Sequence, residues 1–235
     1  MEAKTLIQVI RGLKPKPGAR ILDVGCGDGQ STLRLAEAFD QLRVMGVDFS
    51  ATMIENARER QAARRTSANA VDFRIASVTE LDQAGLPGPF DIVLTGRCLI
   101  NLPDVSAQRA AIGQIATQLG PSGHYIAIEN FHEGHDEMNR ARQAVGLNPI
   151  PIRWHNVYFR ETEFCDMTAP HFEEPAFREF SSAYYFATRV IYSKMCQLRG
   201  EEPDYDHDIH RLAVDLPEIG RFSPIRMAIL RRRCT

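Results

Sequence analysis

Apolar and polar positions change their period several times along the first half of the chain. Short apolar runs rich in β-branched residues alternate with longer segments in which apolar positions recur at helical spacing. This alternation is typical of a parallel sheet whose strands are joined by helices. The predicted strands span 20–24, 43–48, 72–76, 90–95 and 124–130. The predicted helices span 30–39, 51–65 and 106–119, with a short turn at 79–83. Ser106 is the expected N-cap of the third helix, and Gly120-Pro121 is expected to stop it.

The second half of the chain has a weaker pattern. The stretch 131–160 contains several glycines and prolines and predicts a loop with room for one helix. The predicted elements that follow are a helix at 161–168, a strand at 177–185, a helix at 186–198 and a last strand at 225–231. The segment 199–224 is polar and rich in turn residues.

Composition narrows the class of protein. A chain of 235 residues with 44% hydrophobic and 25% charged residues fits one globular domain spanning 1–235. Its net charge of -2 disfavours a dedicated nucleic-acid binder, and no apolar run reaches the roughly 18 residues of a membrane span. The five cysteines are scattered and form no CxxC pair, which indicates reduced thiols. We therefore expect a soluble, cytoplasmic protein.

The sharpest motif follows the first predicted strand and reads Asp-x-Gly-x-Gly-x-Gly, from Asp23 to Gly29. Glycines let the backbone approach a ligand closely, and the helix that begins there offers free N–H groups to an anion. Asp48 ends the next predicted strand, where a carboxylate can accept hydrogen bonds from ribose hydroxyls. These features predict a nucleotide-like ligand.

Together, these two elements resemble those of the class I S-adenosylmethionine-dependent methyltransferases. The run 90–95 resembles the fourth strand of that family, and Gly120-Pro121-Ser122-Gly123 resembles the turn before its fifth strand. The resemblance covers residues 15–131, which we expect to form the cofactor-binding half. It implies an α/β fold with a doubly wound, mostly parallel seven-stranded sheet and helices on both faces. It also implies S-adenosylmethionine as the cofactor, with S-adenosylhomocysteine as the product.

The resemblance also implies roles for single residues. Asp23 is expected near the methionine moiety, and Asp48 at the ribose. The residues expected to admit the cofactor or to fill the glycine loop are Gly25, Cys26, Gly27 and Gly29. Phe49 and Met53 are expected to sandwich the adenine. Where many relatives have an Asp after the third strand, this chain has Ser77 and Val78, which are the expected adenine contacts.

The end of the fourth strand adds Thr95 and Arg97 to the expected cofactor contacts. Arg97 can neutralise the carboxylate of the cofactor or an anion on the substrate through a bidentate contact. Cys98 follows it, but the cysteine that cytosine C5 methyltransferases use is preceded by proline rather than arginine. Covalent catalysis through Cys98 is therefore disfavoured.

Ligands bind at the carboxyl ends of parallel strands, so Glu129, Asn130, Phe131 and His132 are expected to face the site. The candidates for acid–base catalysis are Glu129, His132 and His155. Residues 132–160 and 186–224 are expected to form lid-like insertions after the fifth strand and before the last one. The candidate substrate-binding residues in or beside them are Arg153, Trp154, Tyr184, Tyr185 and Arg189. Metal binding by the His132-x-x-His135-Asp136 run is disfavoured, because a loop offers no fixed second shell.

The sequence therefore predicts transfer of a methyl group to an O or N nucleophile of a small molecule by in-line displacement. An RNA or protein methyltransferase and a non-catalytic, cofactor-binding partner subunit remain as alternatives. A nicotinamide-dependent oxidoreductase is disfavoured by the glycine spacing. We expect neither a membrane nor a nucleic-acid partner, and the sequence leaves the oligomeric state open.

Overall fold

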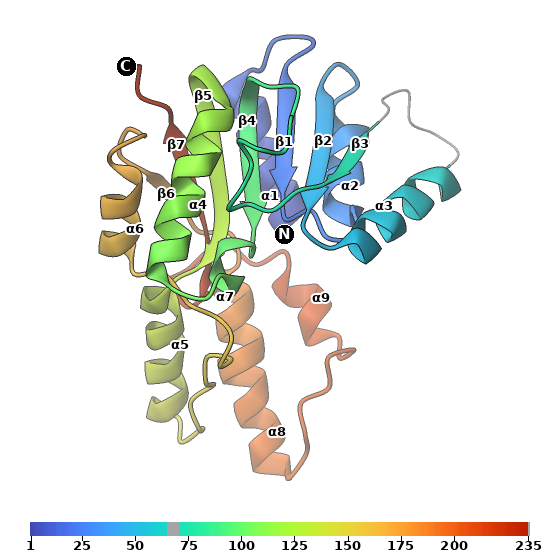
Figure 1. The fold of residues 1–235 in the computed structure, drawn as a ribbon. Helices are drawn as coiled ribbons and strands as arrows, with labels where there is room; N and C mark the ends of the chain where they lie inside the picture. The colour runs from blue at the N-terminus through green and yellow to red at the C-terminus, as the bar shows by residue number, and fades with distance from the viewer. Residues whose placement is uncertain (65–70, 235) are drawn as a thin grey trace.

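The computed structural model describes residues 1–64 and 71–234 and contains one sheet of seven strands in the order β3-β2-β1-β4-β5-β7-β6 (Figure 1). The strands are β1 (Arg20–Val24), β2 (Arg43–Asp48), β3 (Asp72–Ile75), β4 (Phe90–Gly96), β5 (Leu119–Asn130), β6 (Ala176–Arg178) and β7 (Ile225–Arg231). Strands β1 to β5 pair in parallel, whereas β7 is antiparallel to both β5 and β6. The expected seven-stranded, mostly parallel sheet is confirmed.

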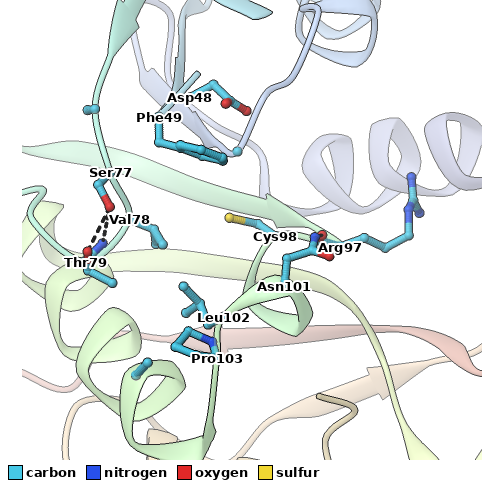
Figure 2. A pocket seen from close by; sticks show the side chains of 13 residues that line it. Asp48, Phe49, Ser77, Val78, Thr79, Arg97, Cys98, Asn101, Leu102 and Pro103 are labelled. Atoms are coloured by element: carbon cyan, nitrogen blue, oxygen red, sulfur yellow. Dashed lines mark hydrogen bonds between the residues drawn. The ribbon is translucent and has the colours of Figure 1, made fainter. Parts of the chain in front are cut away.

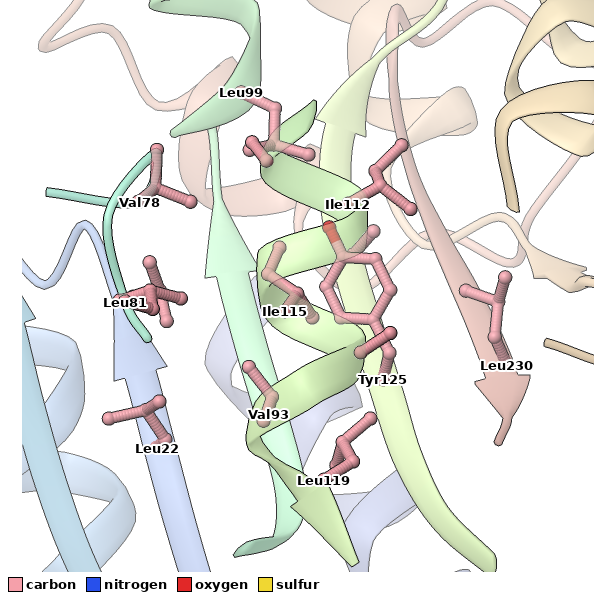
Figure 3. Packing of buried hydrophobic residues seen from close by; sticks show 14 of the residues in the cluster. Leu22, Val78, Leu81, Val93, Leu99, Ile112, Ile115, Leu119, Tyr125 and Leu230 are labelled. Carbon is pink, nitrogen blue, oxygen red and sulfur yellow. The ribbon is translucent and has the colours of Figure 1, made fainter. Parts of the chain in front are cut away.

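Helices cover both faces of this sheet, as expected. Successive side chains of a strand point to opposite faces, so a fully apolar strand feeds two cores. In β1, Ile21 packs in the core below α1 (Glu2–Leu13), α2 (Gln30–Ala38) and α3 (Ala51–Ala63). Its neighbour Leu22 packs in the core below α4 (Val105–Gln118) and α6 (Glu161–Thr168). Figure 3 shows the ring of Tyr125, from β5, between the sheet and α4 in this second core.

A layer of helices lies beyond the carboxyl ends of the parallel strands (Figure 1). It contains α5 (His132–Ala144), α7 (Ser182–Tyr185), a π-helical segment η2 (Phe186–Tyr192), α8 (Ser193–Arg199) and α9 (Ile209–Ala213). The short 3-10 helix η1 (Leu99–Asn101) follows β4 at the same edge. Within the described ranges, no helix is long and apolar enough to cross a membrane.

The stretch 131–160 holds one helix, the 13-residue α5, for which the sequence left room. The boundaries expected for one strand were wrong. The strand expected at 177–185 is limited to Ala176–Arg178, and the aromatic residues after it form α7. Aromatic residues favour strands through their packing, but here a tertiary contact decides, because Glu218 accepts the Ser182 amide at the start of α7.

The ends of two helices also differ from expectation. Helix α4 begins at Val105 with Asp104 as its cap, because Asp104 Oδ1 accepts from the Ala107 amide at 2.8 Å. It ends at Gln118, so the Gly120-Pro121 pair belongs to β5 rather than to a stop signal. Helix α3 ends at Ala63, and Arg65, the expected last residue, lies outside the described residues.

The helical layer packs against the rest of the protein through a close contact at Gly134, which lies in the first turn of α5. A Cβ atom at Gly134 would overlap the backbone carbonyl of Ser223, which lies just before β7. The matched control is Gly113 in α4, where the nearest atom to an added Cβ would be His171 Nε2 at 3.7 Å. Gly134→Ala should lower the free energy of unfolding by about 1–3 kcal/mol, because overpacking displaces backbone.

Gly113→Ala should instead leave the free energy of unfolding unchanged or raise it by up to about 1 kcal/mol, because alanine favours helix. Urea denaturation of the two variants and the unaltered protein measures both effects. Equal stability of the two variants would contradict the close packing of α5 on the Ser223 carbonyl.

Candidate active site

The glycine loop between β1 and α2 adopts a backbone conformation that favours glycine. Gly25, Gly27 and Gly29 all have positive φ, at 73°, 53° and 72°. The Gly27 amide donates to Asp48 Oδ2 at 2.9 Å, which ties the loop to the end of β2. A Cβ at Gly29 would lie 2.7 Å from the Phe73 ring, so this turn also needs glycine for space. The motif therefore builds an exposed backbone surface beside Asp48.

A cavity of about 510 Å³ opens at this loop, at the carboxyl ends of β1, β2, β3 and β4. Its lining residues are Gly25, Asp48, Phe49, Ala76, Ser77, Val78, Thr79, Arg97, Cys98, Asn101, Leu102, Pro103 and Ala107. Figure 2 shows the Phe49 ring beside Asp48, with Val78, Leu102 and Pro103 further along the wall. The Phe49 side chain is 79% exposed, which leaves one large apolar face available to a flat ligand. We call this space the first cavity.

The first cavity contains some of the expected cofactor residues and not others. Gly25, Asp48, Phe49, Ser77, Val78 and Arg97 line it. Asp23, Cys26, Gly27, Gly29, Met53 and Thr95 do not. Thr95 points into the core, where its hydroxyl lies 2.9 Å from the Tyr125 hydroxyl. Met53 lies in the first turn of α3, outside the lining.

Asp23 supports the loop from below. Its carboxylate is buried and accepts from the Thr32 hydroxyl at 2.6 Å, which joins β1 to α2. Burial raises the pKa of Asp23 from 3.8 to about 6, against the lowering effect of the Thr32 hydrogen bond, with nearby Asp48 adding to the rise. In this structure Asp23 anchors the helix that follows the glycine loop.

The structure adds lining residues that sequence reasoning missed. Thr79 contributes to the wall after β3, and its amide donates to Ser77 Oγ at 3.3 Å. Asn101 and Leu102 come from the segment after β4. Their position just after strand ends was a usable signal, because ligands bind at that edge of a parallel sheet. The contribution of Ala107, in α4, had no sequence signal.

Cys98 also lines the first cavity, but its thiol is poorly suited to nucleophilic attack. Burial raises the pKa of Cys98, and the charges of Glu129, Asp48 and Asp23 raise it further. The thiolate, which is the reactive form of cysteine, is therefore disfavoured. This agrees with the expectation from the arginine that precedes it.

A second cavity, of about 300 Å³, lies between the sheet edge and the helical layer. Its lining residues are Arg97, Ile100, Asn130, His135, Met138, Ile150, Pro151, Arg153, Asn156, Tyr158, Tyr185, Arg189, Pro224 and Ile225. Arg97 lines both cavities. Asn156 Nδ2 donates to Asn101 Oδ1 at 2.9 Å, which joins the walls of the two spaces. The two cavities therefore adjoin at Arg97.

The expected catalytic histidines lie outside both linings. His155 is exposed, and its ring meets the edge of Trp154, which is itself 95% exposed. The ring of His132 packs edge-on against Tyr158. His135, which follows the fifth strand together with His132 but was not among the chosen catalytic candidates, is buried and lines the second cavity. A loop pattern does not reveal which histidine faces inward.

Burial favours the neutral form of His135. It lowers the pKa of the ring, against the raising effects of nearby Asp136 and of a hydrogen bond to the Ile150 backbone. Asn139 Nδ2 lies 3.1 Å from His135 Nε2 and donates to the Ile150 carbonyl at 3.0 Å. These contacts hold the His135 ring against the segment that follows α5.

Three of the five expected substrate-binding residues line the second cavity, and two do not. Arg153, Tyr185 and Arg189 line the second cavity. Tyr184 is outside the lining, and its hydroxyl lies 2.8 Å from His210 Nδ1 in α9. Trp154 is outside both cavities.

Glu129, the third expected catalytic residue, is fully buried below the segment that follows β4. Its Oε1 accepts from the amides of Cys98 and Leu99, both at 3.2 Å. Burial raises its pKa from 4.5 to about 7, although these hydrogen bonds act in the opposite direction. Glu129 lines neither cavity, and its hydrogen bonds hold the backbone of Cys98 and Leu99, at the start of η1.

Comparison with known proteins identifies the family. A family model described as a methyltransferase domain matches residues 15–161, well over half of the chain. The chain belongs to the class I S-adenosylmethionine-dependent methyltransferases. The fold agrees with this assignment. The crystal structure of magnesium protoporphyrin IX methyltransferase from Synechocystis with bound SAH aligns with a TM-score of 0.62 and 15% identity. That alignment covers 99% of this chain and 82% of the other.

Curated relatives match only over part of their length. An O-methyltransferase of Penicillium expansum, cnsE, is 35% identical over 141 residues, which cover 58% of this chain and 48% of the relative. Phosphoethanolamine N-methyltransferase 1 of Triticum aestivum is 32% identical over 104 residues, 44% of this chain and 20% of the relative. The chain thus spans about half the length of the first of these relatives and a fifth of the second.

The raised pKa of Glu129 predicts a pH dependence of stability. As the pH rises from 4.5, the unfolded chain loses the Glu129 proton first, whereas the folded protein keeps it until about pH 7. The stability that depends on this proton is therefore complete below pH 4.5 and is lost as the pH rises through about 7. Relative to the unaltered protein, Glu129→Gln should gain about 1–3 kcal/mol of unfolding free energy across this window.

Urea denaturation at several pH values between 5 and 8 measures this difference directly. Glu59→Gln, a change at an exposed position on α3, is the matched control and should follow the unaltered protein at every pH. A Glu129→Gln curve parallel to both would contradict the buried, protonated carboxyl group.

Proposed function

We propose that this protein transfers a methyl group from S-adenosylmethionine in the first cavity to an O or N nucleophile of a small molecule in the second. The observation that carries the proposal is the junction of the two cavities at Arg97, beside the glycine loop. When bound, S-adenosylmethionine supplies an electrophilic methyl group, whose bond to sulfur breaks as the acceptor's lone pair forms the new bond. S-adenosylhomocysteine and a proton from the acceptor are the other products.

The residues of the first cavity fit the parts of this cofactor. Asp48 already accepts from the Gly27 and Ser50 amides, and each of its oxygens has a second lone pair for a ribose hydroxyl. Phe49 offers its exposed ring to the adenine, with Val78 and Ser77 on the adjoining wall. Gly25 presents backbone without a side chain where the cofactor enters. We assign Asp23, Cys26 and Thr95 to support of this wall.

The second cavity fits a small acceptor. Its volume of about 300 Å³ is at the lower end of the range for small-molecule sites. Helix α5 and segment η2 contribute to its wall, which supports a lid role for parts of 132–160 and 186–224. A lid excludes water and aligns the acceptor with the methyl group, and such orientation lowers the barrier substantially.

We assign the histidine role to His135 rather than to His132 or His155, because His135 lines the second cavity. A ring nitrogen of the neutral imidazole can form a hydrogen bond that orients the acceptor. Methyl transfer then proceeds by proximity, and the proton leaves to solvent.

Transfer of a labelled methyl group from S-adenosylmethionine to a cell extract, which is afterwards separated by size, tests the proposal. We expect label in the small-molecule fraction. Label confined to RNA or protein would contradict the substrate class, and absence of S-adenosylhomocysteine binding by calorimetry would contradict the cofactor site.

Asp48 provides a sharper test of the cofactor site. Asp48→Asn keeps the size of the side chain but replaces one acceptor oxygen with an NH2 group. We expect S-adenosylhomocysteine to bind about 10- to 100-fold more weakly, the scale of hydrogen bonds to a charged group. Calorimetry measures the affinity, and thermal unfolding checks that the loop still folds.

The control for this test is Asp82→Asn, at an exposed position outside both cavities, which should bind with unchanged affinity. Equal affinity of a folded Asp48→Asn variant and the unaltered protein would remove Asp48 from the ribose site.

A further inference from the structure

We infer that the methyl acceptor is an anion, and that Arg153 and Arg189 bind its carboxylate or phosphate group while Asn130 holds its nucleophilic hydroxyl or amine. This inference rests on the proposed function, because it assigns the second cavity to the acceptor. It adds the chemical class of the acceptor and a specificity residue, Asn130, at the end of β5.

Charge is the first observation. The second cavity is lined by three arginines, Arg97, Arg153 and Arg189, and by no aspartate or glutamate among the residues that the structure describes. The whole chain has a net charge of -2, so this concentration of positive charge is local. Asp136, the neighbour of His135 in α5, is exposed and outside the lining. A cavity with this imbalance attracts an anion.

Arg189 is held in place without using its hydrogen-bond donors. Its guanidinium lies 5.0 Å from the centre of the Tyr205 ring and 6.0 Å from that of Tyr185. Over residues 1–64 and 71–234, no hydrogen bond or ion pair of this guanidinium is found, and the same is true of Arg153. Contacts with these two tyrosine rings restrict the guanidinium while its N–H groups remain available to an anion.

Arg97 differs from the other two arginines and lies nearest the first cavity. Its guanidinium forms an ion pair with Glu2 of α1, so its charge is already compensated. Its φ of 51° is in the left-handed region, and it is the residue that lines both cavities. The positive charge available to an anion is therefore on Arg153 and Arg189, which line the second cavity and not the first.

Asn130 is the second, independent observation. Its side chain is 7% exposed and lines the second cavity, and its Oδ1 atom is buried with no hydrogen-bond partner in the described part of the chain. A buried acceptor without a donor costs free energy, and a ligand donor removes that cost. A hydroxyl or amine on the acceptor supplies this donor, and the same group carries the lone pair that attacks the methyl carbon.

Inorganic phosphate is a suitable probe for the anion site, because it needs no knowledge of the acceptor. We expect phosphate to raise the melting temperature of the S-adenosylhomocysteine-saturated protein more than potassium chloride does at equal ionic strength. In the double variant Arg153→Met and Arg189→Met, the apparent phosphate affinity should fall about tenfold or more. Arg34→Met, at an exposed position on α2 outside both cavities, should retain it.

The same samples separate the two proposals. S-adenosylhomocysteine affinity, measured by calorimetry, should be equal in all three proteins, and its absence from the unaltered protein would overturn the proposed function alone. Equal phosphate stabilisation of the double variant and the unaltered protein would overturn the anion site alone.

Methylation of the acceptor is the final measurement. A small-molecule extract is divided on an anion exchanger at neutral pH, and each fraction is offered to the protein with labelled S-adenosylmethionine. We expect label in the retained fraction, at a KM that rises at least tenfold in the double variant. Label only in the unretained fraction would overturn the anionic class.

Asn130→Ala tests the second half of the inference with the retained fraction as substrate. It should lower kcat/KM for transfer while phosphate stabilisation is unchanged, because Asn130 is assigned to the nucleophile and not to the anion. Unchanged kcat/KM would overturn that assignment.

Discussion

The hydrogen bond from the Gly27 amide to the Asp48 carboxylate joins the two strand ends on which the first cavity is built. It connects the loop after β1 with the end of β2, and Gly25 and Cys26 reinforce it by donating to the Val47 carbonyl. Only a loop with left-handed glycines can bring its amides to that position. The cavity wall therefore depends on backbone geometry before any ligand contributes, which is the arrangement expected of a preorganised cofactor site.

Two neighbouring residues at the end of β5 have different structural roles. Neighbouring residues of a strand point to opposite sides, so Glu129 and Asn130 have different surroundings. Glu129 lies below the segment after β4 and holds its amides, whereas Asn130 lines the second cavity. One strand end thus positions the wall that the two cavities share and also offers a polar atom to a ligand. Burial disfavours the charged form of the Glu129 carboxyl group and so raises its pKa.

The helical layer forms part of the wall of the second cavity. Class I methyltransferases share the sheet, and the segments between β5 and β7 supply most of the residues that line the second cavity here. Those segments bring arginines and tyrosines to the cavity without a carboxylate, and α5 is seated by the contact of Gly134 with the chain before β7. The first cavity is therefore built on the strand ends of the sheet, whereas the second is built largely by the added helices and loops.

The sequence by itself determined the strands of the first half, the glycine loop and the position of Asp48. These features depend on side-chain period and on residues close together in the chain, and both are visible in a sequence. The position of Asn130 at a strand end also predicted that it faces the site. Only the tertiary structure decided that His135 faces the second cavity, whereas His155 and Trp154 face solvent and Glu129 supports a loop. It also decided that 182–185 is helical, because Glu218 caps it from far along the chain. Which side of a loop or short helix is buried depends on contacts between distant segments. The local sequence pattern does not predict these contacts.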